Sequence, residues 1–219
     1  MLLKKIVILS MFFSAQTVFA EDGDNTSLDF GLGLYKSNID NTDSGSTASL
    51  NQSFQFSISQ TIIPELKLFA SGLLNTCNQN SVNAGVKISP IDLFSLSLSG
   101  GIENAELSYH PDPMFPNIFK DSISLKTLTL KFDSNFYSND TYTLSGGTGL
   151  TIFFPNSNDT FATGYNARKL LDLTIERKIN KNYSIKTSLF YQDEQHTTDF
   201  FNQSQKDMGL KFSFKWSIF

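Results

Sequence analysis

Two histidines lie near carboxylates in the sequence, and they are its best candidates for catalytic residues. His196 follows Asp193 and Glu194, and His110 precedes Asp112 with one proline between them. A histidine beside a carboxylate can act as a general base. No motif such as G-x-S-x-G fixes a serine near either histidine, and the sequence has no two matching acidic pairs. We therefore expect no catalytic residue and no enzyme; a hydrolase at the rim of the molecule is the weaker alternative.

The composition points away from metals and nucleic acids. Cys77 is the single cysteine, so it has no partner for an internal disulfide, and with only two histidines there are few zinc or copper ligands. We expect no metal and no cofactor. The net charge of −4 also argues against a nucleic-acid partner, because phosphate binding needs a basic footprint. Charged residues are only 17% of the chain and aromatic residues 13%.

The first 20 residues have the three parts of a secretory signal peptide. Lys4 and Lys5 precede an apolar stretch from Ile6 to Phe13, and Val18–Ala20 forms a small-x-small ending before two acidic residues. Polar residues interrupt this region, so it is too short for a membrane-spanning anchor. We expect cleavage after Ala20, with residues 21–219 forming one exported domain.

Ten segments of the remaining chain alternate apolar and polar residues, as strands between two different environments do. In Met208–Ile218, for example, Leu210, Phe212 and Phe214 alternate with Lys211, Ser213 and Lys215. The phase breaks at Gly100–Gly101, where we expect a β-bulge. The ten segments are Ser27–Lys36, Leu50–Gln60, Leu66–Leu74, Val82–Ile88, Leu93–Tyr109, Ser122–Phe132, Thr141–Phe154, Arg168–Ile179, Tyr183–Gln192 and Met208–Ile218.

The connections between these segments alternate in length. Four of them are short and rich in turn formers: Ile62–Glu65, Ser89–Asp92, Asn135–Asp140 and Asn180–Asn182. The connections on the other side are polar, and four of them are longer: Ser37–Ser49, His110–Asp121, Pro155–Tyr165 and Asp193–Asn202. Thr76–Asn80 is the short exception on that side. Short turns at one end and long loops at the other are typical of a barrel in the outer membrane.

The polar face of the strands distinguishes a barrel from a soluble sandwich. In a soluble β-sandwich this face would meet water and carry many charges, whereas here it is mostly Ser, Thr, Asn, Gln and Gly. A barrel in lipid needs an apolar outer band and a closed ring of paired backbone groups. The pattern therefore predicts an all-β fold, an antiparallel up-and-down transmembrane β-barrel of about ten strands, with eight or twelve as alternatives.

The alternation places many charged side chains in the lumen of this barrel. Arg168, Asp172 and Glu176 are spaced four apart, so they should line one wall about 13 Å apart. The charges form either a salt-bridge network that fills a narrow lumen or a polar path whose excess lysine favours anions, and both can hold at once. The full set is Asp29, Lys67, Lys87, Glu103, Lys126, Lys131, Arg168, Asp172, Glu176, Lys178, Lys186, Lys211 and Lys215.

Two of the long loops carry aromatic and apolar side chains. Exposed apolar clusters often mark contact sites, and the alternatives are a lid over the mouth of the barrel or part of its aromatic girdle. The candidate contact residues are Met114, Phe115 and Phe119, with neighbouring Ile118, and Phe200 and Phe201.

The final strand resembles those of the Gram-negative outer-membrane β-barrel superfamily. The resemblance is carried by Met208–Phe219 and above all by the terminal Phe219. It implies that Trp216, Ile218 and Phe219 form the signal read by the barrel-assembly machinery. In that superfamily the apolar residues are in phase with the terminal aromatic residue, whereas here Phe212, Phe214, Trp216 and Ile218 are offset from Phe219 by one residue. A terminal bulge, or Ile218 acting as the last in-phase residue, would reconcile this difference.

We expect a monomer in the outer membrane of a Gram-negative bacterium, in contact with lipid. Its function is either a narrow small-solute channel or a filled barrel that presents surface loops. The alternative is adhesion or colonisation through the loops at 110–121 and 193–202, with an extracellular ligand or surface partner.

Overall fold

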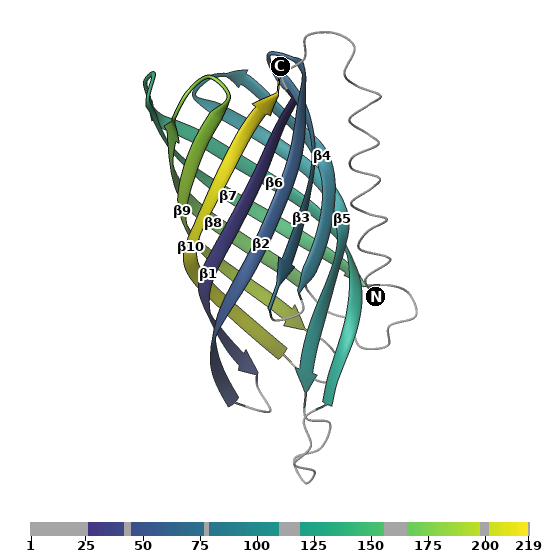
Figure 1. Ribbon diagram of the computed structural model, residues 1–219. Coiled ribbons are helices and arrows are strands. Elements are labelled where there is room, and N and C mark those ends of the chain that lie inside the picture. Colours follow the sequence, from purple (N-terminus) through teal and green to yellow (C-terminus); the bar gives the residue numbers. More distant parts are fainter. Residues whose placement is uncertain are drawn as a thin grey trace.

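Ten antiparallel strands close into a barrel in which β1 pairs with β10 and every other strand pairs with its neighbours in sequence (Figure 1). The computed structural model describes residues 26–41, 45–76, 79–109, 119–155, 166–197 and 202–218. No helix among them is long and apolar enough to cross a membrane. The strands are β1 Thr26–Asn41, β2 Gly45–Ile63, β3 Leu66–Asn75, β4 Asn80–Ile91, β5 Phe94–Tyr109, β6 Phe119–Ser138, β7 Tyr142–Pro155, β8 Asn166–Lys178, β9 Tyr183–Thr197 and β10 Asn202–Ile218.

The two ends of the barrel differ in their connections. One end, here called the turn end, carries the short connections 64–65, 92–93, 139–141 and 179–182, together with the start of β1 and the end of β10. The opposite end, the loop end, carries the connections 42–44, 76–79, 110–118, 156–165 and 198–201. The ten-stranded antiparallel barrel predicted from the alternation is thus confirmed.

Several strands are longer than predicted. Residues 37–41 and 45–49, expected in a loop, pair with each other as the ends of β1 and β2. Residues 193–197 likewise belong to β9. These stretches are polar on both faces, so the alternation that reveals a strand is lost there. The bulge expected at Gly100–Gly101 was wrong, because β5 keeps an unbroken register with β6 through both glycines.

The strands are staggered around the ring. Stepping from partner to partner starts at Ser27 on β1 and returns to β1 at Ile39, twelve residues further along. A stagger of this kind requires the strands to tilt by about 35–45° to the barrel axis. Residues far apart in the sequence and on non-adjacent strands are thereby brought to one level of the lumen.

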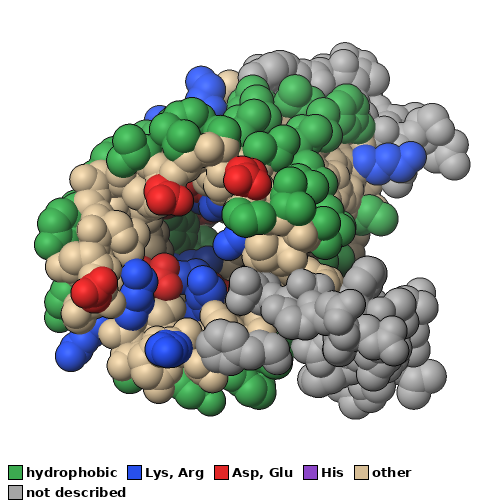
Figure 2. Space-filling model, turned by 90° about the horizontal axis from the view of Figure 1, so that it is seen from above, with side chains coloured by type: hydrophobic (Ala, Val, Ile, Leu, Met, Phe, Trp, Pro, Cys, Tyr) green, Lys and Arg blue, Asp and Glu red, His purple; other side chains and the backbone are tan. Residues whose placement is uncertain are grey.

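The barrel is apolar outside and polar inside. Large hydrophobic side chains stay exposed on the outer face, with Leu32 at 65% and Phe212 at 50%. Most of the buried side chains in the described residues are polar or charged. Figure 2, which looks onto the turn end, shows hydrophobic side chains around the outside and charged side chains around a central hollow. This inversion of a soluble protein suits a barrel surrounded by lipid.

Gly209 is needed for close packing inside the barrel. A Cβ there would lie 2.3 Å from the carbonyl oxygen of Leu34 and 2.4 Å from Cβ of Tyr35. Tyr35 is 5% exposed and packs on Phe190 with ring centroids 5.9 Å apart. We expect Gly209→Ala to lower the free energy of unfolding by about 1–3 kcal/mol, because rigid backbone has to move.

Gly100 offers the matched control for this substitution. A Cβ there meets no atom closer than the carbonyl oxygen of Thr127 at 3.6 Å, so Gly100→Ala should be neutral or slightly stabilising. Denaturant unfolding of the refolded barrel in detergent measures both. Equal effects of the two alanines would contradict the packing argument.

Candidate functional site

The inner face holds all but one of the charged residues that the alternation assigned to it. Lys126 is the exception: it is exposed, and it lies on the outer face between Ile102 and Phe154. Lys126 is in phase with the outward-facing Leu128, so strict alternation also places it outside, and its assignment to the lumen was wrong. The predicted charged residues that do face inward are Asp29, Lys67, Lys87, Glu103, Lys131, Arg168, Asp172, Glu176, Lys178, Lys186, Lys211 and Lys215.

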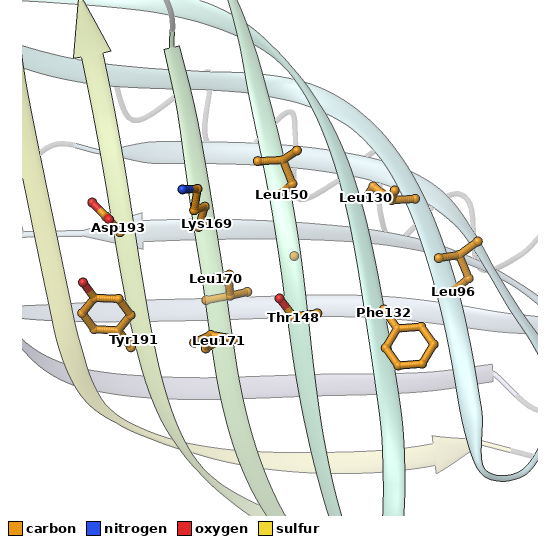
Figure 3. Close-up of a pocket in the computed structure, with 11 residues that line it drawn as sticks. Leu96, Leu130, Phe132, Thr148, Leu150, Lys169, Leu170, Leu171, Tyr191 and Asp193 are labelled. Carbon is orange, nitrogen blue, oxygen red and sulfur yellow. The ribbon is translucent and has the colours of Figure 1, made fainter.

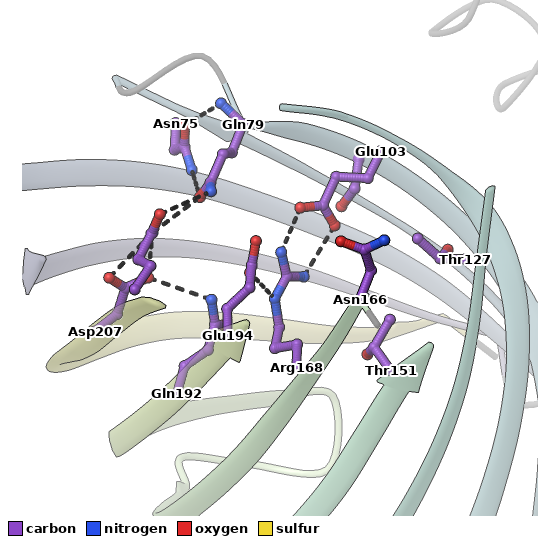
Figure 4. A network of polar contacts seen from close by, with 12 residues as sticks. Asn75, Gln79, Glu103, Thr127, Thr151, Asn166, Arg168, Gln192, Glu194 and Asp207 are labelled. Atoms are coloured by element: carbon purple, nitrogen blue, oxygen red, sulfur yellow. Dashed lines mark hydrogen bonds and ion pairs between the residues drawn. The ribbon is translucent and has the colours of Figure 1, made fainter. Parts of the chain in front are cut away.

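Near the loop end, Arg168 joins carboxylates from two other strands (Figure 4). Its Nη1 donates to Oε2 of Glu103 at 2.9 Å, and its Nη2 donates to the other carboxylate oxygen. Its Nε donates to Oε2 of Glu194 at 2.5 Å. Glu103 lies on β5 and Arg168 on β8, so this bidentate pair passes β6 and β7 and crosses the lumen. The face of Phe153 packs 4.9 Å from the guanidinium carbon.

His196 is part of the same cluster, and both of its ring nitrogens are occupied. Nε2 bonds to Oε1 of Glu194, and Nδ1 lies 2.9 Å from Oδ1 of Asn166. The side chain is 3% exposed and packs on Phe153. His196 lies in strand β9, not in the loop expected from the sequence. We call Glu103, Asn166, Arg168, Glu194 and His196 the arginine cluster.

A second network crosses the lumen beside the arginine cluster (Figure 4). Nε2 of Gln79, just before β4, donates to Oε1 of Gln205 on β10 at 3.3 Å. Gln205 in turn donates to Asp207 at 3.0 Å, and Gln192 on β9 donates to the same carboxylate at 3.2 Å. We call these four residues the glutamine network. Together with the arginine cluster it places polar side chains from β5, β8, β9, β10 and the residue before β4 across the loop end of the lumen.

Further toward the turn end, ion pairs lie along the wall. Lys131 bridges Asp133 and Asp172, each at 2.8 Å, and Lys87 reaches Asp133 at 3.2 Å. Gly147 makes room for this group, because a Cβ there would lie 2.4 Å from Oδ1 of Asp133. These residues come from β4, β6, β7 and β8.

The three acidic and basic residues predicted to line one wall of β8 take part in different contacts. Arg168 belongs to the arginine cluster, and Asp172 pairs with Lys131. Glu176 accepts a hydrogen bond from the hydroxyl of Ser184 at 2.5 Å. All three do lie on the inner face of β8.

The turn end of the lumen is rich in lysine. Lys186 pairs with Asp29 at 2.5 Å. Lys67, Lys211 and Lys215 form no salt bridge with any side chain that the structure describes. Lys67 and Lys215 line a cavity of about 500 Å³ at this end, with hydroxyl groups of Ser27, Thr61 and Ser217. The charged hollow in Figure 2 is at this end of the barrel.

The remaining predicted site residues belong to the outer face or lie outside the described residues. Trp216 and Ile218 face outward at the turn end, where Trp216 stacks with Tyr183 at a centroid distance of 6.3 Å. Phe219 and the candidate loop contacts Met114, Phe115, Phe200 and Phe201 lie outside the described residues, as do Cys77, His110 and residues 1–25. Phe119 begins β6.

The sequence did not identify the glutamine network or the role of Asn166. Gln203, Gln205 and Asp207 alternate on the inner face of β10, and amides at alternate positions near a strand end were the available signal. Within the described part of the chain, no group of three or more His, Cys, Asp or Glu is arranged to hold a metal ion.

This closed antiparallel barrel, with an apolar exterior and a charged lumen, is the fold of Gram-negative outer-membrane β-barrels. No family model matches the sequence, and no curated protein matches it. Among solved structures, the outer membrane protease OmpT from Escherichia coli is similar, with a TM-score of 0.57 and 9% identity over 89% of this chain and 97% of that one.

Two other barrels resemble the chain less closely. The translocator domain of the autotransporter NalP from Neisseria meningitidis has a TM-score of 0.45 and 8% identity, covering 95% of each chain. The NanC porin has a TM-score of 0.40 and 8% identity, covering 82% of this chain and 98% of that one. The similarity to OmpT, at 9% identity, establishes the fold and no shared activity.

Proposed function

We propose that this chain is an outer-membrane barrel whose lumen is a narrow pathway that favours anions, with its turn end facing the periplasm. The arginine cluster and the glutamine network narrow this pathway toward the cell exterior. The proposal includes export by the first 20 residues, assembly through the C-terminal strand and a monomeric barrel. The proposal therefore combines the filled lumen and the anion path. Polar contacts fill the lumen near the loop end, and the path remains open toward the turn end.

The unpaired lysines at the turn end carry this proposal. Lys67, Lys211 and Lys215 project into the lumen without a salt-bridge partner among the described side chains. Charges confined by low-dielectric walls focus the electric field and raise the local concentration of ions of opposite sign. A filled, purely structural lumen would be expected to pair its lysines, as Lys131 is paired.

The arginine cluster supports a structural role at its level and no catalysis. Glu194 is 1% exposed and is bonded to both Arg168 and His196. His196 has both ring nitrogens occupied, so neither is free to accept a proton from a substrate. We therefore propose that the chain is not an enzyme. Adhesion through the loops at 110–121 and 193–202 is the alternative, and it rests on the sequence pattern of those loops.

Ion selectivity tests the proposal. The refolded barrel in planar bilayers under a salt gradient should give a reversal potential on the anion side. The double substitution Lys211→Glu and Lys215→Glu should move that potential to the cation side, because it reverses the field at the turn end. Lys126→Glu is the matched control, since Lys126 is an exposed lysine on the outer face, and it should leave the reversal potential unchanged.

Circular dichroism and heat-modifiable gel mobility of the same samples establish that each variant has folded. A folded barrel with no conductance, or a reversal potential that the double substitution does not move, would rule out the anion pathway and turn the search to the loops.

A further inference from the structure

A row of charged side chains lies on the outer face near the loop end, beyond the apolar band. Asp193 on β9 is the register partner of Lys206 on β10 and of Lys169 on β8. Both lysines are exposed. On the turn-end side of the row the same strands present Met208, Tyr191 and Leu171 outward, which are all exposed hydrophobic residues. The row therefore lies where a membrane-facing surface becomes polar.

An apolar groove of about 440 Å³ begins at this row (Figure 3). Lys169 and Asp193 line it together with Leu130, Phe132, Leu150, Leu171 and Tyr191. Figure 3 shows Lys169 and Asp193 side by side on neighbouring strands, and Thr148 between Phe132 and Leu171. The short side chain of Thr148 leaves the depression between these larger neighbours.

Asp193 carries an atom that the barrel itself does not satisfy. Its Oδ1 is buried and has no hydrogen-bond partner among the described residues. A buried acceptor without a donor costs free energy. A hydroxyl or amide group on a molecule held in the groove would supply that donor.

From these three features we propose that the groove binds a phosphorylated lipid of the surrounding outer leaflet. One acyl chain lies along Thr148 and its apolar neighbours, the phosphate lies between Lys169 and Lys206, and a hydroxyl or amide beside the phosphate donates to Asp193. The charges select the occupant: two lysines flanking a single carboxylate complement an anionic headgroup that also carries donors. The inference rests on the proposed orientation in the outer membrane, with the turn end facing the periplasm, and is independent of conduction through the lumen.

Native mass spectrometry of the refolded barrel in detergent tests this inference, with diphosphorylated lipid A as the probe and its dephosphorylated form for comparison. We expect one retained lipid and a preference for the phosphorylated form. Replacing Lys169 and Lys206 with glutamine should weaken binding by about thirtyfold. Lys126→Gln is the matched control, because Lys126 is an outward-facing lysine that does not line the groove.

The groove is tested separately by filling it. Thr148→Leu should weaken binding of both forms of the lipid, whereas Thr187→Leu, an outward-facing threonine on β9 away from the groove, should not. Equal affinity in the wild type and the lysine variant, or full binding to the Thr148→Leu barrel, would overturn the inference. Loss of lipid binding with unchanged ion selectivity leaves the proposed function standing, and the reverse result leaves this inference standing.

Discussion

Replacing Arg168 with methionine is expected to lower the free energy of unfolding by about 3–5 kcal/mol. Arg168 is the described cation that pairs with both Glu103 and Glu194, whose side chains are 4% and 1% exposed. Removing it leaves Glu103 without its ion-pair partner and Glu194, among the described side chains, with only its bond to His196, while both carboxylates stay buried. Chemical denaturation of the refolded barrel, followed by tryptophan fluorescence and gel mobility, measures the loss.

Two further variants make this prediction specific. Lys178→Met removes a cation from the same strand, but Lys178 is exposed and its side chain donates only to the carbonyl oxygen of Asn139 among described residues. That variant should change stability by less than about 0.5 kcal/mol. Adding Glu103→Gln and Glu194→Gln to Arg168→Met should recover most of the stability, because no unpaired charge remains. If the Arg168→Met barrel were as stable as the Lys178→Met barrel, the contacts of the arginine cluster across the lumen would not stabilise the fold.

Replacing Glu103, Arg168 and Glu194 together with alanine is expected to raise single-channel conductance several-fold. These side chains cross the lumen from β5, β8 and β9. Their removal together widens the level that they cross without leaving one charge of the three unpaired. Anion preference should persist, because the lysines at the turn end are untouched. Planar-bilayer recording of the wild type and the variant in the same salt measures both quantities.

A pair of wall residues gives the control for this second prediction. The hydroxyls of Thr129 and Thr151, 2.8 Å apart, join neighbouring strands β6 and β7. Their replacement with alanine removes lumen-facing atoms without opening a contact that crosses the lumen, so conductance should stay near that of the wild type. If the triple-alanine barrel folds and conducts no more than this control, the pathway is closed elsewhere and the arginine cluster does not limit it.

The stability and conductance predictions both follow from a difference between the loop end and the turn end of the lumen. Near the loop end, charges and amides are paired across the lumen, as in Arg168 with Glu103 and Gln79 with Gln205. Toward the turn end, pairs such as Lys131 with Asp133 stay along the wall, and Lys211 is left without a salt bridge among the described side chains. We therefore expect the contacts near the loop end to set the stability of the barrel and the lysines toward the turn end to set its proposed ion selectivity.

The amino-acid sequence by itself determined the fold class and which face of most strands is polar. A strand places successive side chains on opposite faces, so alternation such as Leu210, Lys211, Phe212 and Ser213 reveals both the strand and its two environments. The pattern was lost for residues 37–41 and 45–49, because β1 and β2 continue past the apolar band and are polar on both faces there. Lys126 obeys the alternation, since it faces outward in phase with Leu128, and its assignment to the lumen was wrong.

Only the tertiary structure decided which inward-facing residues meet. Glu103 and Arg168 are 65 residues apart, and alternation states only that each faces the lumen. They come together because the strands are staggered by twelve residues around the closed ring, which sets the level of every side chain. That stagger is a property of ten strand pairings taken together, so no single segment of the sequence carries it.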